Sequence, residues 1–311
     1  MRAGSGPRPA RILARKRSDA PGEAALEQII VNGVVLAANY ALIALGLTLI
    51  FGILNFLNFA HGQMYMVGGF VVYYVYAIFD MNYFVALLAC ALTLFCIGVA
   101  FETLFFRRVL RITTREENSM LLAVGTALLL ENLALSLFGE KQRGVPPVVT
   151  GVYQIFGAYL PASRLLVLVL SALLVIGLLL FVQYTKPGRA MRAVAQDKEV
   201  TLLMGVNVGR ISALGFGIGA ALAGLAGGLL ITTSAINSGI GTAISIKAFI
   251  MIMIGGAGVV AGAILGGIVL GFTEAIGYAL IPGSMTYLLI FIGLILFLII
   301  RPQGIMGKPW G

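Results

Sequence analysis

The chain has 311 residues, of which 60% are hydrophobic and only 11% are charged, and its mean hydropathy is +1.02. Because a soluble domain carries about 25% charged residues, this composition excludes an ordinary soluble protein and predicts an all-α polytopic membrane protein in a lipid bilayer. The formal net charge of +9 comes from Lys and Arg residues in the N-terminal tail and in the loops between apolar segments. Membrane topology accounts for such a distribution, so we predict no nucleic-acid partner.

The cysteines exclude a second group of functions. Cys90 and Cys96 are the only two, and they lie six residues apart within one apolar segment. This spacing puts them on different faces of a helix, so they form neither a disulfide nor a metal site. We predict no metal and no cofactor.

Residues 1–27 are too polar for the apolar core of a secretory signal and too biased in composition to fold alone. They combine Gly, Pro and Ser with six basic side chains: Arg2, Arg8, Arg11, Arg15, Lys16 and Arg17. We predict a disordered basic tail, with a transit peptide or an overextended gene start as alternatives. Residues 28–311 are predicted to form a single transmembrane domain.

Apolar segments occupy most of that domain and predict eight or nine crossings. They span residues 29–54, 56–79, 82–106, 119–138, 164–184, 211–232, 244–258, 259–279 and 284–301. The segment 244–258 is shorter than the roughly 20 residues that a crossing needs and it ends in several glycines, so it is predicted to be a half-helix. Broken helices in lipid are tolerated only where they pack inside protein or line a cavity.

Loop charges predict the orientation of these segments. Loops 107–118 and 185–210 and the C-terminal tail are basic, which places them in the cytoplasm. The connections 80–82, 233–243 and 280–283 carry no Lys or Arg, so they are predicted to face outward. The loop 139–163, which carries Lys141 and Arg143 among prolines, is predicted to face outward as well. Two crossings before residue 80 would put the basic N-terminal tail outside, against the charge rule, unless the first segments do not simply cross twice. We favour an outside N-terminus because the later loops agree.

The longest polar interruption in the membrane domain is the loop 185–210. Arg189, Arg192, Gln196 and Glu199 recur at helical spacing opposite Met191, Val194 and Leu202, which predicts an amphipathic helix from Arg189 to Met204. Gly205, Asn207 and Gly209 end it. One interpretation is a solvated loop with an interfacial helix, and the other is an element that couples the protein to a cytosolic partner.

Polar residues within the predicted spans are candidates for a translocation path, because such side chains usually face the bundle or a water-filled route. The candidates are Asn39, Asn58, His61, Glu131, Asn132 and Glu274. For His61, the only histidine, we favour a structural role at a helix end or on a backbone carbonyl over a role in the path. The alternative for the two glutamates is a position near a membrane face. Glu102 lies near Arg107 and Arg108 and is expected to anchor a helix end.

Glycines recur at four-residue steps between residues 247 and 274, which favours close helix packing over substrate contact. They are Gly258, Gly262 and Gly266 in one series and Gly267 and Gly271 in another. The chain contains no G-x-x-x-x-G-K-[ST] sequence and no G-x-G-x-x-G sequence in a strand–helix context. Any ATP that drives this protein must therefore be hydrolysed by a partner.

Several stretches together are similar to a known family. They are ALIALGLTLIFGILNFLNFAHGQMYMVGGF at 41–70, GRAMRAVAQDKEVTLLMGVNVGRISAL at 188–214, KAFIMIMIGGAGVVAGAILGGIVLGFTEAI at 247–276 and RPQGIMG at 301–307. In order and spacing they closely resemble the LivH-type permease of branched-chain amino-acid ABC importers. The resemblance extends from about residue 28 to the C-terminus.

This resemblance implies a non-enzymatic, multi-pass subunit of the bacterial inner membrane. Its implied partners are a second, LivM-like permease subunit, two cytosolic ATPase subunits and a periplasmic substrate-binding protein. Ala195, Asp197, Leu203, Gly205 and Asn207 match the family's cytoplasmic loop that contacts an ATPase, and Arg189, Arg192 and Lys198 lie beside them. Thr201, where a small residue such as Ala is expected, and the basic tail depart from the family pattern.

Other functions stay open at this point. Related importers carry urea, amides or aromatic acids, and the permease sequence does not distinguish among these solutes. A secondary transporter or channel could use His61 and the two glutamates as a proton route. A membrane-embedded enzyme is disfavoured because no metal-ligand set or nucleophile–base pair occurs. Genes for an ATPase and a binding protein beside this one would favour the importer.

Overall fold

The computed structural model describes residues 21–112, 116–155, 157–281 and 284–307. The chain is helical almost throughout, with one short antiparallel hairpin in which Val152 pairs with Pro161 and Ile155 with Ala158. The elements are α1 (Pro21–Leu54), α2 (His61–Val72), the π-helical η1 (Tyr73–Ile78), α3 (Tyr83–Phe101), the π-helical η2 (Glu102–Phe106), α4 (Arg107–Ile112), α5 (Glu116–Phe138), β1 (Val152–Ile155), β2 (Ala158–Pro161), α6 (Ala162–Tyr184), α7 (Lys186–Gln196), α8 (Lys198–Leu203), α9 (Val208–Leu230), α10 (Ile240–Gly255), α11 (Val260–Leu280) and α12 (Ser284–Ile300).

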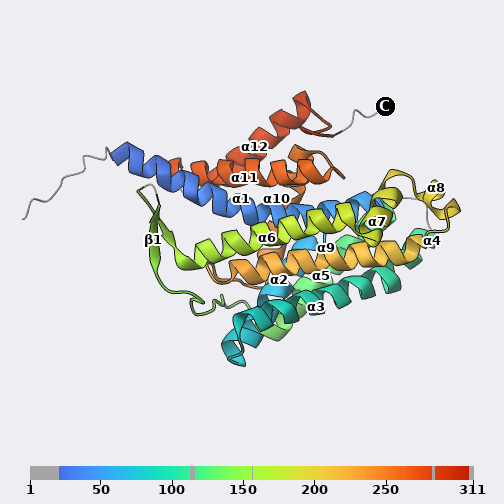
Figure 1. Ribbon diagram of the computed structural model, residues 1–311, viewed down its shortest axis with the longest axis horizontal. Coiled ribbons are helices and arrows are strands. Elements are labelled where there is room, and N and C mark those ends of the chain that lie inside the picture. The colour runs from blue at the N-terminus through green and yellow to red at the C-terminus, as the bar shows by residue number, and fades with distance from the viewer. Residues whose placement is uncertain (1–20, 113–115, 156, 282–283, 308–311) are drawn as a thin grey trace, which may run out of the picture.

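The long helices lie side by side, and their connections gather at two opposite ends of the molecule (Figure 1). One end, the loop-helix end, holds α4, α7 and α8. The other, the hairpin end, holds β1 and β2. Arg107 contacts the backbone of Gly209, so the two basic loops meet at the loop-helix end. Arg143 pairs with Ile236 in a backbone bridge, so two of the predicted outward connections also meet each other.

Helix α1 runs from the hairpin end to the loop-helix end. At its start, the Gln28 side chain exchanges hydrogen bonds with the backbone N–H and carbonyl of Tyr159 in β2. Near its other end, a Cβ built on Gly52 would lie 3.8 Å from the Cβ of Ala195 in α7. The predicted boundary of the tail at residue 27 differs from the structure, in which α1 begins at Pro21. The rest of the predicted tail, residues 1–20, lies outside the described residues.

The second apolar segment is a broken crossing rather than a continuous helix. Residues 55–60 are not helical, and Asn55 has a φ of 57°. Phe56, Asn58 and Ala60 are nevertheless buried, and Phe56 stacks on Phe106 with 5.0 Å between ring centroids. The irregular backbone therefore packs inside protein, which is the condition for tolerating it at membrane depth.

Among the described residues, six helices are long and apolar enough to cross a membrane: Leu26–Leu54, Tyr83–Val109, Glu117–Phe138, Ala162–Tyr184, Val208–Leu230 and Val260–Leu280. The chain is thus a polytopic helical membrane protein, as predicted. The apolar helices α10 and α12 are shorter. The expected half-helix is α10, which ends at Gly255 and is followed by Gly256 with a φ of +108°.

Glycines on α11 lie close to two other helices. Cβ atoms built on Gly267 and Gly271 would come within 2.6 Å of the backbone nitrogens of Ala41 and Ala37 in α1. On another face, Gly262 and Gly266 meet the backbone of α10 at Gly255 and Met251. Gly258 differs from the prediction, because it precedes α11 and its φ of +78° belongs to the turn after α10.

Candidate functional site

Helix α7 is fixed onto the bundle at the loop-helix end. The Thr185 hydroxyl caps its first turn by accepting a hydrogen bond from the Gly188 N–H at 3.1 Å, and Pro187 occupies that turn. Gly188, Met191 and Val194 are buried. A Cβ on Gly188 would lie 2.2 Å from the Phe181 carbonyl oxygen, so α7 packs very closely against the end of α6.

The structure divides the predicted helix Arg189–Met204 in two at Asp197. This residue is extended, with a φ of −154°, and ends α7. Its Oδ1 then accepts hydrogen bonds from the N–H groups of Glu199 and Val200, each at 2.9 Å, and so caps α8. The prediction of one helix from Arg189 to Met204 is therefore wrong. An aspartate at the N-terminus of a helix is a capping signal, and the continuous helical spacing concealed it here.

Helix α8 carries an exposed apolar tip. Leu203 and Met204 are 84% and 79% exposed, and Leu202 and Val200 are also exposed. The spacing predicted that Leu202 shares a face with Met191 and Val194. In the structure those two residues are buried and Leu202 is exposed. After the tip, Gly205 has a positive φ, +81°, and the Asn207 side chain caps α9 by accepting a hydrogen bond from the Arg210 N–H.

All eight residues of the predicted coupling set are exposed: Arg189, Arg192, Ala195, Asp197, Lys198, Leu203, Gly205 and Asn207. Thr201, the departure from the family pattern, is buried and donates its hydroxyl to the Asp197 carbonyl at 2.6 Å. Its side chain thus stabilises the same short helix that Asp197 caps.

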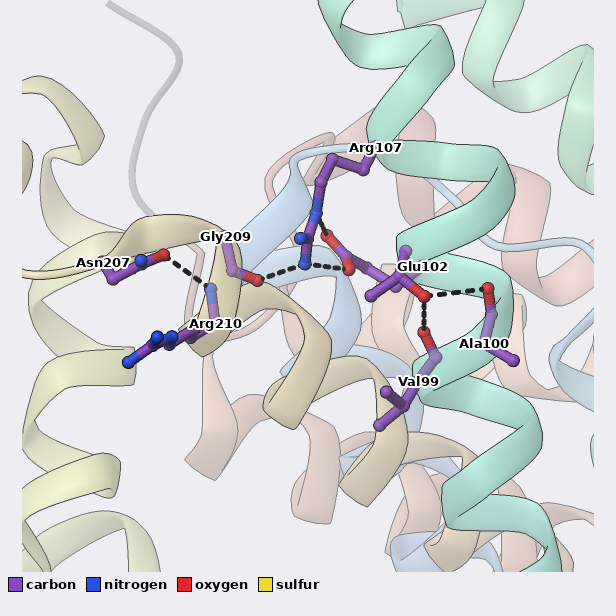
Figure 2. A network of polar contacts seen from close by, with 8 residues as sticks. Val99, Ala100, Glu102, Arg107, Asn207, Gly209 and Arg210 are labelled. Carbon is purple, nitrogen blue, oxygen red and sulfur yellow. Dashed lines mark hydrogen bonds and ion pairs between the residues drawn. The ribbon is translucent and has the colours of Figure 1, made fainter.

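A partly buried ion pair connects the start of α9 to the end of the third span. Glu102 is 2% exposed, and Arg107 donates to its carboxylate at 2.6 and 3.2 Å. The same guanidinium donates to the Gly209 carbonyl at 2.6 Å, so it bridges η2 and the start of α9 (Figure 2). Glu102 therefore pairs with Arg107 at a helix end, and this contact connects the 185–210 loop to the bundle.

Three of the predicted path residues bond to nearby backbone. Asn39 donates to the Ala226 carbonyl at 3.2 Å, Asn58 accepts from the Ala60 N–H, and His61 Nε2 lies 3.1 Å from the Ile43 carbonyl. His61 also begins α2. This is the geometry of the structural role that we favoured for it.

Glu274 lies in a second polar cluster, which we call the Lys247 cluster: the buried Tyr40 and Glu274, Lys247, and the exposed Tyr278 and Tyr287. Lys247 Nζ is 2.7 Å from Glu274 Oε1 and 2.8 Å from the Tyr40 hydroxyl. All three tyrosine hydroxyls lie within hydrogen-bonding distance of the Glu274 carboxylate. Glu274 is 2% exposed, so its alternative position in water near a membrane face is not what the structure shows.

Glu131 has a different environment from its neighbour Asn132. Its Oε2 accepts hydrogen bonds from Gln63 Nε2 at 2.9 Å and from the Thr242 hydroxyl at 2.7 Å. Asn132 is exposed and donates to the Leu128 carbonyl of its own helix. Neither ion pair of the described residues includes Glu131.

Comparisons with known proteins fit this architecture. Residues 29–300 match the family described as the permease component of branched-chain amino acid transport systems. The chain belongs to this permease family. It is 34% identical over 294 residues to the high-affinity branched-chain amino acid transport system permease protein BraD of Pseudomonas aeruginosa, covering 91% of this chain and 96% of that protein.

Two further relatives extend the family assignment. The LivH proteins of Escherichia coli K12 and Salmonella typhimurium, with the same description as BraD, are each 32% identical, over 91% of this chain and 96% of theirs. No solved structure matches the chain. Family membership and six apolar spans make this a multi-pass membrane transport subunit rather than an enzyme.

Proposed function

We propose that this chain is a permease subunit of an ATP-driven importer of branched-chain amino acids. The support is the match of nearly the whole chain to permeases described for these solutes, together with a docked loop helix that presents an apolar tip. Since the chain has no phosphate-binding loop, ATP hydrolysis falls to two cytosolic ATPase subunits. A LivM-like permease and a periplasmic binding protein complete the assembly in the inner membrane.

The number of crossings follows from where the two ends of the domain lie. Helix α1 starts at the hairpin end. After α12, the N–H groups of Ile305 and Met306 donate to the carbonyls of Ile254 and Gly255 at the end of α10. The turn that follows α10 lies near the loop-helix end, because its Gly258 is close to Phe51 in the last turn of α1. The end of the domain therefore lies near the loop-helix end. Termini on opposite sides require an odd number of crossings, so we propose nine rather than eight, with the hairpin end in the periplasm.

The observation that carries the coupling role is the exposed apolar tip beyond a docked α7, formed by Val200, Leu202, Leu203 and Met204. Gly188 and Thr185 fix α7 on the bundle, and the Arg107 bridge fixes the start of α9. A push on the tip would therefore be transmitted to α6 and α9 rather than absorbed by a flexible loop. Apolar side chains exposed in a polar loop are typical of a protein contact.

The test measures leucine uptake, membrane abundance and copurification of the ATPase subunits with the chain. Asp197→Arg and Gly205→Val should abolish uptake and weaken copurification while abundance stays near normal. Asp197→Asn is the matched control, because Asn caps helices as well as Asp and keeps α8 intact. Normal uptake in Asp197→Arg with the ATPases still bound would refute the coupling role.

A further inference from the structure

The cavity next to Glu131 has a volume of about 370 Å³ and lies between the end of α5 and the start of α10. Its lining includes Glu131 and Leu135 of α5, Glu140 just after that helix, and Asn237, Ser238 and Gly239 just before α10. Ser238 donates to the Gly139 carbonyl, which holds these two segments together on the hairpin side of the bundle. The volume is within the usual range of small-molecule sites, about 300–1,000 Å³.

The polar groups around this cavity are fixed by three different elements. Gln63 of α2 is 1% exposed, and its Nε2 donates to both Glu131 of α5 and Thr242 of α10. Its Oε1 is buried and has no hydrogen-bond partner among the described residues. A Cβ on Gly241 would lie 2.2 Å from this oxygen, so the amide packs directly against the first turn of α10.

The charges around the cavity complement a zwitterion. Glu131 has no cationic partner among the described side chains, and its Oε2 accepts hydrogen bonds from Gln63 and Thr242 while its Oε1 accepts none from the described residues. Arg143, in the loop that follows α5, is bonded to Phe138 and Tyr74 instead. Next to Glu131, no side chain caps the N-terminus of α10 at Gly239, where the Ile240 N–H donates to the Asn237 carbonyl. Uncapped helix N-termini attract carboxylates.

We propose that this cavity is a transient site for the amino acid during passage, in which Glu131 accepts the ammonium group and the first-turn amides of α10 receive the carboxylate. Gln63 is a positioning residue that holds the Glu131 carboxylate against α10, and Leu135 supplies apolar contact for the aliphatic side chain. The inference rests on the proposed function and adds the site where the permease itself recognises the solute. Broken half-helices frame substrate carboxylates in other transporters, and α2 and α10 supply two such termini here.

Transport by the complete reconstituted importer tests the role of Glu131. Glu131→Gln keeps an acceptor oxygen for Gln63 and Thr242 but removes the charge. It should lower the rate of leucine uptake at least about tenfold, because charge-assisted hydrogen bonds are the strong ones. ATP hydrolysis stimulated by the loaded binding protein should continue. Glu117→Gln, the same change at an exposed carboxylate near the start of the same helix, is the control and should transport normally.

Occupancy of the cavity can be read directly. Gly239 has room for a side chain, since a Cβ there meets nothing within 4 Å, so Gly239→Cys in a Cys96→Ser background provides a thiol at the cavity. Leucine should slow its reaction with a maleimide in the complete importer, and Glu131→Gln should abolish that protection.

The outcomes separate this inference from the proposed function. The inference would be overturned if Glu131→Gln took up leucine at the wild-type rate and leucine still protected the thiol in it. It would also be overturned if leucine gave no protection in a complex that transports. Either result would leave the proposed function standing. If the wild-type importer takes up no branched-chain amino acid, the proposed function fails. Protection by the 2-hydroxy acid analogue as strong as by leucine would also contradict an ammonium site.

Discussion

Glu274 and Glu131 are both acidic side chains on apolar helices, but only Glu274 has a cationic partner among the described residues. Glu274 is paired with Lys247 and surrounded by three tyrosine hydroxyls, so its charge is fully compensated inside the bundle. Glu131 is held by two neutral donors, lacks a cation among the described residues and borders a cavity. A closed ion pair can only hold helices together, whereas an uncompensated carboxylate beside a cavity is available to a cationic ligand.

The largest effect should follow from breaking the closed pair. Lys247→Met leaves Glu274 buried without its counter-charge, and removing one partner of such a pair costs about 3 to 5 kcal/mol. Membrane abundance and the apparent melting temperature of the purified importer should both fall. The double variant Lys247→Met/Glu274→Gln should recover much of the loss.

Lys198→Met, which removes an exposed lysine, is the control for a general effect of lost charge. Equal stability of Lys247→Met and Lys198→Met would show that the Lys247 cluster does not hold the helices.

A smaller loss is expected when the helices of that cluster are forced apart. Gly271 of α11 lies against the backbone of Ala37 in α1, one turn from Tyr40. Gly271→Val should separate the Tyr40 hydroxyl from Glu274 and cost about 1 to 3 kcal/mol, the usual range for overpacking. Gly293→Val on α12, where a Cβ meets nothing within 4 Å, should leave the melting temperature nearly unchanged.

Composition and spacing predicted the class of protein, the apolar segments and the glycines that approach other helices. They also indicated that Glu102 lies near Arg107 at a helix end and that a helix stops at Gly205, because both depend on neighbours in the chain. Asp197 was misplaced, since helical spacing continues across a break that only its capping bonds reveal.

Contacts between distant segments could not be read from the sequence. Lys247 stood in an apolar stretch with no visible partner, and the turn between α10 and α11 brings Glu274 to it from 27 residues away. Gln63 and Glu131 are 68 residues apart, and their contact depends on how the non-helical residues 55–60 place the start of α2. Such contacts arise from packing of whole helices and leave no local pattern.

The ion pair of Glu102 with Arg107 lies closer to the surface than that of Glu274 with Lys247, and it extends the comparison to a third acidic residue. Glu102 is as buried as Glu274, but its partner Arg107 is 29% exposed at the side chain. Arg107→Lys keeps the charge and loses the planar fork that reaches both the carboxylate and Gly209, so we expect a loss of about 1 kcal/mol. Arg108→Lys is the neighbouring control. The melting temperature of the importer checks this, and a loss as large as that of Lys247→Met would contradict the distinction between interior and surface pairs.

The smallest effect on stability should come from Glu131→Gln, and it is the sharpest test of the contrast between the two glutamates. Both hydrogen bonds to Glu131 end on Oε2, so an amide oxygen in the same position can accept them. No cation among the described residues loses its partner, and removing an uncompensated charge lowers the cost of burial. We expect the free energy of unfolding to change by less than about 0.5 kcal/mol. The same substitution at Glu274 strands Lys247 and should cost several times more. If Glu131→Gln destabilised the importer as much as Glu274→Gln, Glu131 would have a structural counter-charge, and its carboxylate would not be free to meet an ammonium group.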